Sequence, residues 1–482
     1  MVDEKYNELL IGWIEANKDR ILEQWIELAK IPSIKAEAIE GAPFGENCRQ
    51  ALDKAASFFE ADGFKTKISD GNTYALCSYG DGEKKIGLFS HSDVVPVGDD
   101  WIYTKPFEPV IIDGTLIGRG VEDNKSGVMA ALCLFRFLKE NNISLNSTLE
   151  LFIGSDEECG MGDMKEYLTK EKMPDVSIVP DADFPCSIGE KGIYHLMIKS
   201  KAPFESIISI DGGEAYNIVL DKVKVCLPYS ETVLEEIKEK ISDKSSFSVD
   251  ANEEIITLLV KGIAKHASIP EGSMNAALLA AEFLLSCSFV SDNDKQLLGG
   301  AKQLLSCYYG KGLGIEHEDP VFGKTTCVNG LCRTVGGKLR LSFDIRYGDT
   351  VNPVELEKTA DACLDKNGFI PVEKDNRPGF LIDRDNPLPG IFEDIYAELT
   401  GERLERVTMA GGTYARKLKN AFSVGTYIIK KDRKAPVFKM PDGHGGAHQC
   451  DECIDIEGFF EAVKVLFNYV LACDVVLFNA AN

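Results

Sequence analysis

Apolar residues recur at helical spacing at the start of the chain and then gather in short runs. Residues 4–29 carry them at positions such as Trp13, Ile21 and Trp25, and Pro32 ends this pattern. Further helices are predicted over 46–61, over 125–139, where nearly every position is apolar, and over 162–169. Strand-like runs lie between the helices, at 65–69, 74–78, 86–90, 148–154 and 176–180. Strands that alternate with helices predict an α/β sheet covered on both faces.

The pattern changes after residue 185. Strand pairs and helices then follow an α+β rhythm, including a hairpin predicted from strands 327–335 and 338–347 around Gly336-Gly337. From about residue 385 onward a helix at 388–399, a strand at 422–425 and a helix at 456–472 could complete the first domain. We therefore predict a discontinuous domain formed by residues 1–185 and 384–482, with residues 186–383 inserted as a second domain.

Charge and cysteine usage narrow the class of protein. The 482 residues hold 53 Lys and Arg against 77 Asp and Glu, a net charge of −24. Such a surface repels nucleic acid and anionic membranes and attracts cations, although solubility is its simplest explanation. No apolar run approaches the ~18 residues of a membrane span, and the first residues lack the order of a signal peptide. Fourteen scattered cysteines indicate a reduced, cytoplasmic protein without a disulfide framework.

Acidic and imidazole side chains follow the ends of several apolar runs. His91 ends one run and Asp93 lies two residues later; the others are Asp123, the pair Glu157-Glu158, Asp181, and either His444 or His448. Imidazole nitrogen and carboxylate oxygen are zinc ligands, and strand ends point side chains into a crevice at the edge of a sheet. Together these residues suggest a zinc hydrolase.

Each of these residues also has a simpler explanation. His91 on its own is more often a satisfied core histidine, and Asp123 before a buried helix suits an N-cap. Glu157 and Glu158 could form a solvated acidic loop, although two adjacent glutamates at a strand end are costly without a compensating cation. One of them could bind metal while its neighbour acts as general base.

The same residues form motifs of a known family. Residues 91–96, His-Ser-Asp-Val-Val-Pro, resemble a His-x-Asp-x-Val-Pro motif, and residues 118–126, Gly-Arg-Gly-Val-Glu-Asp-Asn-Lys-Ser, resemble Arg-Gly-x-x-Asp-x-Lys-Gly/Ser. The glutamate pair and residues 448–452, His-Gln-Cys-Asp-Glu, are similar to the family's Glu-Glu and closing His-x-x-Asp/Asn-Glu motifs. Four motifs in this order, over nearly the whole chain, resemble the ArgE/DapE/aminoacylase-type metallopeptidases.

The resemblance implies a doubly wound, mixed-sheet α/β catalytic domain with an inserted α+β, ferredoxin-like lid. It also implies two zinc ions per chain, with manganese or cobalt as alternatives, bridged by Asp123. Glu157 would be the general base that takes a proton from a shared water, and Asp93 would orient His91. The implied metal ligands are His91, Asp123, Glu158, Asp181 and His448.

The inserted domain carries a second signature. Residues 265–276, Lys-His-Ala-Ser-Ile-Pro-Glu-Gly-Ser-Met-Asn-Ala, resemble the family's lid motif, which implies that His266 stabilises the oxyanion. Arg346, in Asp-Ile-Arg-Tyr, would grip the substrate carboxylate, and Asn217 matches a lid position that touches substrate. Gly411 and Gly412 resemble a glycine-rich loop whose amides could bind a carboxylate.

The long insert, and residues 180–185, resemble the PepV-like dipeptidase branch. That likeness implies a monomer that hydrolyses unblocked dipeptides or similar small, carboxylate-bearing substrates, without nucleic acid or membrane. A deacylase acting on N-acyl amino acids would use the same site, and the sequence separates the two poorly. A binding protein with a relict site is a third class, but the complete ligand set argues against it. Cys159 and Cys450 lie beside the motifs, and we expect both thiols to be buried and inert, the alternative being that either thiol alters the choice of metal.

Overall fold

The chain folds into two compact units. The computed structural model describes residues 2, 4–241, 245–429, 436 and 438–481. The first unit comprises Met1–Gly189, Ile382–Val407 and Gly412–Asn482, and the second comprises Glu190–Leu381 and Thr408–Gly411. The second unit is thus an insertion into the first, and the chain crosses between the units several times.

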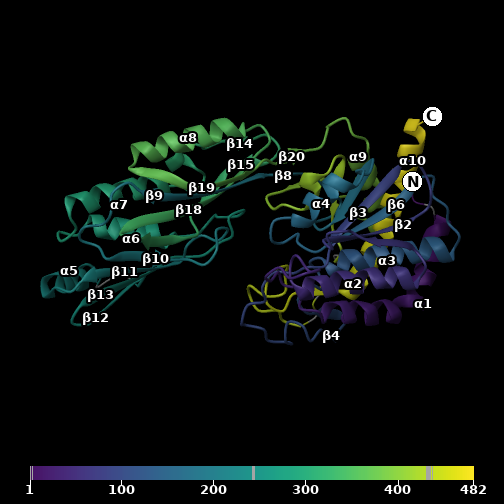
Figure 1. The fold of residues 1–482 in the computed structure, drawn as a ribbon, viewed down its shortest axis with the longest axis horizontal. Helices are drawn as coiled ribbons and strands as arrows, with labels where there is room; N and C mark the ends of the chain where they lie inside the picture. Colours follow the sequence, from purple (N-terminus) through teal and green to yellow (C-terminus); the bar gives the residue numbers. More distant parts are fainter. Residues whose placement is uncertain (1, 3, 242–244, 430–435, 437, 482) are drawn as a thin grey trace. The chain divides into compact units, whose positions relative to one another are not determined.

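The first unit contains a mixed sheet with the strand order β1-β2-β6-β3-β7-β22-β8. Strands β6, β3, β7 and β22 run parallel, whereas β1 and β2 are antiparallel additions at one edge. The parallel strands are buried over almost their whole length, as expected when helices cover both faces (Figure 1). The strands are β1 (Lys65–Ile68), β2 (Tyr74–Tyr79), β3 (Lys85–His91), β6 (Thr148–Gly154), β7 (Val176–Pro180), β8 (Ser187–Glu190) and β22 (Ala421–Val424), with the short β20 (Phe380–Leu381) and β21 (Val407–Met409) where the chain crosses between units.

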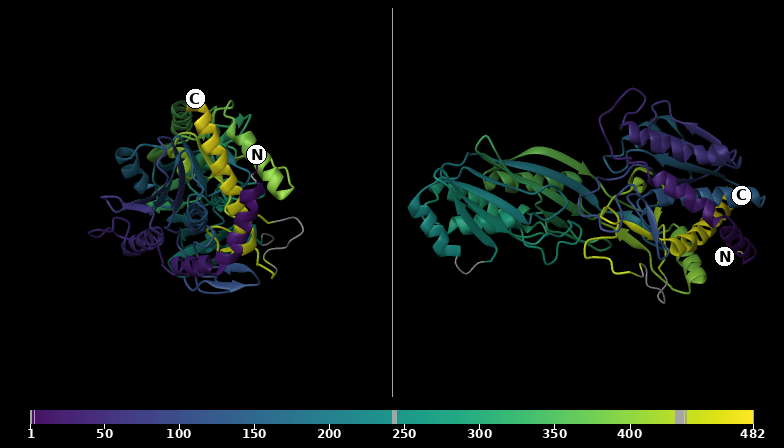
Figure 2. Two further views of the ribbon diagram at one scale, coloured as in Figure 1. Left: turned by 90° about the vertical axis from the view of Figure 1, so that its right-hand side faces the viewer. Right: turned by 90° about the horizontal axis from the view of Figure 1, so that it is seen from below.

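Helices pack on this sheet and on one another. Helix α10 runs beside α1, and Asn468 on α10 donates a hydrogen bond of 3.1 Å to Asn7 on α1 (Figure 2). The final helix reaches Ala481, so its predicted end at residue 472 is wrong; Cys473 and Asp474 are still buried beyond the predicted end. The helices are α1 (Glu4–Ala29), α2 (Glu46–Ala61), α3 (Lys125–Glu140), α4 (Gly162–Lys170), α9 (Leu388–Thr400), α10 (Ile456–Ala481) and the short 3₁₀ helix η2 (Tyr414–Lys417).

Aromatic rings join the sheet to α4. Tyr167 of α4 meets the rings of Phe89 and Phe152 edge-on, at centroid distances of 5.5 and 5.0 Å. Because side chains alternate across a strand, the neighbouring positions Leu88 and Leu151 point to the opposite face, on the side of α2 and α3. The α/β sheet covered on both faces is therefore confirmed. This packing fixes the strands whose ends carry the candidate site.

A three-stranded sheet, β23-β5-β4, accompanies the main one. It consists of β4 (Val110–Ile112), β5 (Thr115–Ile117) and β23 (Cys453–Asp455), and all pairs are antiparallel. Asp113 and Gly114 turn the hairpin with φ values of 47° and 79°, which is the backbone of a two-residue turn. The pairing of β23 with β5 brings the chain near residue 450 beside the loop near residue 118.

The second unit is built on one antiparallel sheet with the order β12-β13-β11-β10-β17-β18-β9-β19, and β16 also pairs with β18. The α+β class of the insert is confirmed. Its helices are α5 (Glu231–Ile241), α6 (Ala276–Leu285), α7 (Asp292–Leu305), α8 (Pro353–Lys366) and η1 (Lys311–Leu313). Its strands are β9 (Gly192–Ser200), β10 (Ser209–Gly212), β11 (Lys222–Pro228), β12 (Phe247–Ala251), β13 (Ile255–Lys261), β14 (Glu318–Asp319), β15 (Gly323–Lys324), β16 (Thr326–Val328), β17 (Cys332–Val335), β18 (Lys338–Tyr347) and β19 (Phe369–Arg377).

The hairpin predicted from residues 327–347 is present, but its first strand is interrupted. Residues 329–331 leave the ladder between β16 and β17, where a Cβ on Gly330 would lie 2.1 Å from the carbonyl oxygen of Ala215. The glycine therefore lets a neighbouring loop approach closely, a tertiary contact that strand-like composition does not reveal.

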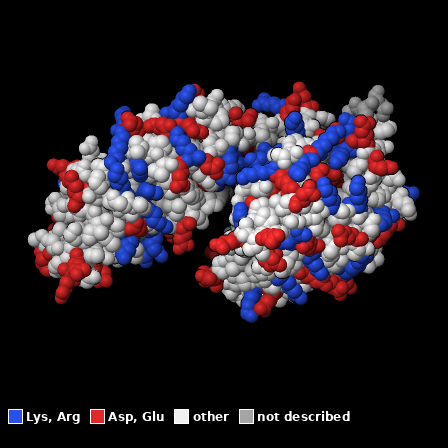
Figure 3. Space-filling model, in the orientation of Figure 1, with Lys and Arg blue, Asp and Glu red and all other residues white. Residues whose placement is uncertain are grey.

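The distribution of charged side chains on the surface agrees with solubility as the simplest explanation of the net charge. Figure 3 shows acidic and basic side chains interspersed over the visible face of both units, without one dominant acidic patch there. Within the described residues, no helix is long and apolar enough to cross a membrane.

Candidate metal centre and lid residues

The candidate ligands of the first unit gather at one edge of its sheet. His91 is the last residue of β3, Glu158 follows β6, and Asp181 directly follows β7. Because β3 is parallel to both β6 and β7, their carboxyl ends meet at the same edge. Asp123 reaches this edge from the turn that precedes α3, and His448 from the loop before β23.

Asp123 lies at the centre of the cluster. Its Oδ1 is 3.2 Å from His91 Nε2, and its Oδ2 is 2.9 Å from His448 Nε2. Glu158 Oε1 lies 3.2 Å from the same His448 nitrogen, and Asp181 Oδ2 lies 3.9 Å from His91 Nε2. The two oxygens of one carboxylate thus face two different imidazoles, each with a further carboxylate beside it.

The capping explanation for Asp123 is wrong. The N-cap of α3 is Asn124, and no side-chain hydrogen bond caps this helix. Asn124 instead donates from Nδ2 to the carbonyl of Pro180 at 2.5 Å and to Asp181 Oδ1 at 3.1 Å. The carboxylate of Asp123 therefore remains directed at the histidines.

The structure separates His448 from His444. His444 Nδ1 lies 2.7 Å from Asp451 Oδ2, and Asp451 also accepts hydrogen bonds from the amides of Ile102 and Tyr103. His444 thus belongs to a loop-closing network, whereas His448 joins the carboxylate cluster.

Asp93 has two contacts with the neighbouring site residues. His91 Nδ1 lies 3.0 Å from the backbone carbonyl of Asp93 and 3.5 Å from its carboxylate oxygen Oδ1. That carboxylate accepts the amides of Glu157 and Glu158, each at 3.2 Å. The closer contact to the imidazole is therefore made by main chain, while the carboxylate holds the glutamate turn in place.

Burial and crowding shift the proton affinities of the cluster. Burial, followed by the negative charges of Asp181 and Glu158, raises the pKa of Glu157 well above its ordinary value. Burial opposes protonation of His448, but hydrogen bonds to Asp123 and Glu158 outweigh it and raise the pKa to about 11. Burial also raises the pKa of Asp181, with Asp123 as the second cause. Several carboxylates thus share a buried space that favours additional positive charge.

The donor set fits a metal ion. Ligand atoms of His91, Asp123 and Glu158 all lie within 4.8 Å of one another. His91 Nε2 is buried and has no well-directed hydrogen bond among the described residues, and Glu157 Oε1 has no partner there at all. Imidazole nitrogens combined with carboxylate oxygens suit zinc, manganese or cobalt. The cluster can therefore bind a cation, and Glu157 can act beside it.

Two supporting contacts were not found from the sequence. Glu452 Oε1 accepts the amides of Glu122 and Asp123 at 2.9 and 3.1 Å, while its Oε2 accepts from Arg119 Nη1 at 2.6 Å. Arg119 and Glu452 are buried, so their ion pair holds in place the backbone that carries Asp123. Glu452 and Arg119 lie inside quoted motifs, which was the one available signal of their role.

The second contact involves Tyr414 and Asp163. Asp163 Oδ2 accepts the amides of Ser155 and Asp156, at 2.8 and 2.9 Å, and the Tyr414 hydroxyl at 2.5 Å. These bonds hold the start of the turn that leads to Glu157. Tyr414 follows Thr413, whose hydroxyl accepts the Ala415 amide at the start of η2.

Two of the lid residues predicted from the sequence, His266 and Asn217, lie in the second unit. His266 Nδ1 accepts the amide of Ser268 at 3.2 Å, so the proton of a neutral ring lies on Nε2. Asn217 Nδ2 lies 3.5 Å from this Nε2, and the Asn217 carbonyl accepts the Ala267 amide at 2.8 Å. The structure thus brings His266 and Asn217 together. The asparagine of the same motif, Asn275, is the N-cap of α6.

Arg346 and the Gly411-Gly412 loop are the other substrate contacts predicted from the sequence. Arg346 is buried on β18 and donates from Nη1 to the carbonyl of Ala410 at 3.0 Å. Gly411 follows in the second unit, whereas Gly412 belongs to the first. A Cβ on Gly412 would lie 2.5 Å from the Arg416 guanidinium, so glycine permits this close approach.

The two cysteines beside the site motifs, Cys159 and Cys450, are less buried than predicted. Cys159 is exposed, so its predicted burial is wrong; the turn after Glu158 leaves it at the surface. Cys450 is half-buried, and its Sγ lies 3.6 Å from the Val97 carbonyl. All fourteen cysteines are free of disulfides.

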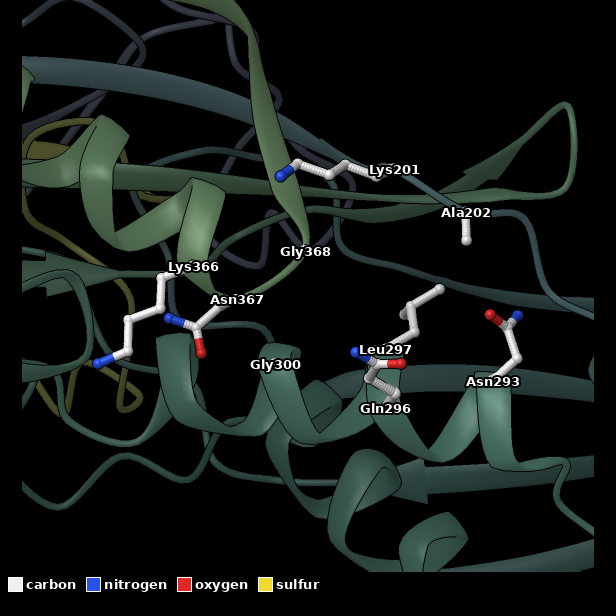
Figure 4. A pocket seen from close by; sticks show the side chains of 9 residues that line it. All are labelled: Lys201, Ala202, Asn293, Gln296, Leu297, Gly300, Lys366, Asn367 and Gly368. Atoms are coloured by element: carbon white, nitrogen blue, oxygen red, sulfur yellow. The ribbon is translucent and has the colours of Figure 1, made fainter.

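A pocket elsewhere in the second unit offers different chemistry. It lies between α7 and the turn that follows α8 (Figure 4). Its lining holds no histidine, cysteine or carboxylate, and Lys201 is paired with Asp365 at 2.6 Å. We therefore do not assign catalysis to it. The lining residues are Lys201, Ala202, Asn293, Gln296, Leu297, Gly300, Lys366, Asn367 and Gly368.

Comparison with known proteins identifies the family. The profile of Peptidase family M20/M25/M40 matches residues 87–472. The chain belongs to this family. It is 30% identical over 461 residues to "Putative dipeptidase YtjP" of Bacillus subtilis (strain 168), a match that covers 93% of this chain and 96% of that protein. A Staphylococcus aureus (strain USA300) protein, also named "Putative dipeptidase", is 28% identical over 469 residues, covering 94% and 96%.

Solved structures share the fold of this M20-family chain. Human carnosine dipeptidase 1 matches with a TM-score of 0.62 at 13% identity, covering 97% of this chain and 98% of that one. Dug1p of Saccharomyces cerevisiae, described as a di-peptidase, matches with a TM-score of 0.58 at 13% identity, covering the same shares. Identity this low concerns the fold alone. Membership of the M20 family makes the protein a peptide-bond hydrolase, of a family whose enzymes are typically metal-dependent.

Proposed function

We propose that this M20-family protein is a metal-dependent dipeptidase that hydrolyses the single amide bond of unblocked dipeptides. The observation that carries the proposal is the cluster around Asp123, beside which a carboxylate oxygen of Glu157 has no hydrogen-bond partner among the described residues. Relatives named as dipeptidases, at about 30% identity over almost the whole chain, support this substrate class. Cysteines free of disulfides support a place in the cytosol.

Two metal ions fit the proposed site. The two oxygens of Asp123 face different imidazoles, an arrangement suited to a bridging carboxylate. His91 and Asp181 would complete one site, and Glu158 and His448 the other. Zinc is our first candidate, with manganese or cobalt as alternatives. When bound, the metal ions supply Lewis acidity for the scissile carbonyl and lower the pKa of the attacking water.

Glu157 is the proposed general base. Its Oε1 is buried and unpartnered among the described residues, and the turn that carries it is held by Asp93. The raised pKa of its carboxyl gives the carboxylate enough basicity to accept a proton from water. The same carboxyl then returns that proton to the leaving amine, which completes hydrolysis.

Residues of the second unit are the proposed substrate contacts. His266 presents an Nε2 proton because Ser268 occupies its Nδ1, and such a donor suits an oxyanion. Asn217 lies beside it and is a second polar contact. Arg346, with the Gly411-Gly412 loop, would bind the substrate carboxylate. We further propose that the enzyme acts as a monomer.

The proposal is tested by comparing unblocked dipeptides with matched N-acetyl amino acids. Protein stripped with EDTA is reloaded with zinc, manganese or cobalt, and hydrolysis of both substrate classes is measured. We expect metal-restored cleavage of the dipeptides, and cleavage slower by about 10²–10⁴-fold by the Glu157→Gln variant under the same loading. Cleavage of the acyl compounds alone would replace the proposal with an N-acyl amino acid deacylase.

A further inference from the structure

Behind Arg346 lies a series of hydrogen-bonded side chains, which begins at the buried Arg346 and Asp344 and continues to the partly buried His195 and Arg377. Arg346 donates from Nε to Asp344 Oδ1 at 2.5 Å and from Nη2 to Asp344 Oδ2 at 2.8 Å. Both residues lie on the same face of β18, two positions apart, and Asp344 is fully buried. The aspartate therefore grips one edge of the guanidinium in a two-point contact.

The next member of the series is His195, on the neighbouring strand. His195 pairs directly with Asp344 in the ladder between β9 and β18, and its Nε2 lies 3.2 Å from Asp344 Oδ2. Its Nδ1 lies 3.2 Å from Arg377 Nη2 on β19. An arginine can only donate, so Nδ1 must accept, and the proton of the neutral ring is on Nε2. His195 thus donates to Asp344.

The ring of His195 is also held from its face. Tyr216 packs on it with a centroid distance of 5.1 Å and an interplanar angle of 35°. Arg377 is in turn 3.2 Å from Asp375 Oδ2 through its Nε. The imidazole is therefore fixed in tautomer by Arg377 and in orientation by Tyr216.

The series leaves Arg346 with two donors to offer. A guanidinium has five N–H groups, and three of those on Arg346 are engaged by Asp344 and the Ala410 carbonyl. One N–H on each terminal nitrogen has no partner within the described part of the chain. Two donors of this kind match a carboxylate bound at two points.

We propose that His195, with Arg377 behind it, is a positioning residue that sets the specificity of this peptidase for substrates with a free carboxylate. The inference rests on the proposed role of Arg346. Asp344 Oδ2 accepts from both Arg346 and His195, so the plane of its carboxylate is fixed, and the guanidinium plane with it. Without the His195 donor the aspartate can rotate with its arginine, and the two-point match to a substrate carboxylate is lost.

The same hydrogen bonds lower the pKa of Asp344. Burial alone would raise the pKa of Asp344, but the bonds from His195 and Arg346 outweigh it and lower the pKa to about 2. Asp344 is therefore ionised at neutral pH. A permanent charge suits a fixed support for the arginine.

The test compares His195→Leu with His195→Gln, whose side-chain amide can still donate to Asp344. For each variant, KM and kcat are measured on a dipeptide, together with the inhibition constant of the same dipeptide carrying a C-terminal amide. We expect His195→Leu to raise KM by about tenfold or more, as for loss of one hydrogen bond to a charged group, with kcat within about threefold. The constant for the amide should stay unchanged, and His195→Gln should restore most of the wild-type KM.

Two further variants exclude a loss of folding as the cause. His317→Leu removes another histidine of the second unit, which contacts Thr350, and should leave KM unchanged. Arg377→Met removes the donor to Nδ1, together with the contact to Asp375, and should raise KM in the same direction by a smaller factor. The inference is overturned if His195→Leu weakens the carboxylate and the amide ligand equally, or leaves both unchanged. A wild-type enzyme that cleaves no dipeptide would instead refute the proposed function, and the inference with it.

Discussion

The Tyr414 hydroxyl donates a hydrogen bond of 2.5 Å to Asp163, 251 positions earlier in the chain. Asp163 in turn accepts the amides of Ser155 and Asp156, directly before the glutamate pair. Burial raises the pKa of this aspartate to about 6, with the charge of Asp93 as the second cause. A residue that follows the insertion thus stabilises the turn of the proposed general base.

Removing this hydroxyl should affect both stability and rate. We expect Tyr414→Phe to lower the free energy of unfolding by about 1–3 kcal/mol, since a buried carboxyl group loses a donor. The rate constant kcat should fall as well, because the turn of Glu157 loosens. Tyr469→Phe is the control: its hydroxyl donates only to the carbonyls of Pro185 and Phe392, so stability should fall while kcat holds. Urea unfolding and steady-state kinetics measure both quantities, and equal kcat losses in the two variants would contradict the role of Tyr414.

Substitutions of the adjacent residues Glu157 and Glu158 should affect catalysis and metal binding separately. We expect Glu157→Gln to lower kcat by about 10²–10⁴-fold with bound metal retained, because a general base contributes about that much. Glu158→Gln should lower metal content instead, since its carboxylate lies against His448. Metal analysis by mass spectrometry, made on the same samples as the kinetics, distinguishes the two. Metal loss in Glu157→Gln would show that this residue is a ligand.

Two histidines, one from each unit, give a test of the ligand assignment. His448→Ala should release one of the two proposed metal ions, because its Nε2 lies between Asp123 and Glu158. His317→Ala, in the second unit, is the matched control and should keep full metal content. Titration of the stripped variants with zinc measures the stoichiometry. An unchanged zinc count in His448→Ala would remove this histidine from the site.

Asp319 in the second unit should make stability depend on acid pH. Burial would raise its pKa, but the Thr350 hydroxyl and the amides of Phe322, Thr350 and Val321 outweigh it and lower the pKa to about 2. Because this folded value lies below the ordinary 3.8, the stabilisation is complete above about pH 4 and is lost as the pH falls towards 2. The stability gap between wild type and Asp319→Asn should therefore be large near pH 7 and shrink near pH 3. Urea unfolding at both values measures the gap, and a gap that grows in acid would contradict this sign.

Most helices and strands of the first unit could be predicted from the sequence, because the local periodicity of apolar residues determines such elements. Strand 176–180 and helix 46–61 have the predicted bounds. The interruption at Gly330 escaped prediction because it depends on a loop more than a hundred residues away. The local pattern of apolar residues indicates burial and secondary structure, but it does not indicate which distant segment of the chain packs against a given residue.

Candidate ligands such as His91, Glu158 and Asp181 were recognisable because each lies at or after the end of an apolar strand, but the geometry of the ligand cluster was not. Spacing alone left His444 and His448 equal, and the family motif favoured His448. In the structure His444 contacts Asp451, whereas His448 contacts Asp123 and Glu158. Asp93 was expected to orient His91 through its carboxylate, whereas the shorter contact is made by its carbonyl. The bond of Tyr414 to Asp163 had no sequence signal, because neither residue lies in a run that suggests the other.

The ligand cluster also imposes an order on synthesis of the enzyme. His91, Asp123, Glu158 and Asp181 precede the insertion, whereas His448 follows it. A ribosome-bound chain therefore carries an incomplete site throughout translation of the whole second unit. If these residues bind the metal ions as proposed, peptide cleavage requires His448, so a chain that ends before this residue cannot digest peptides in its surroundings.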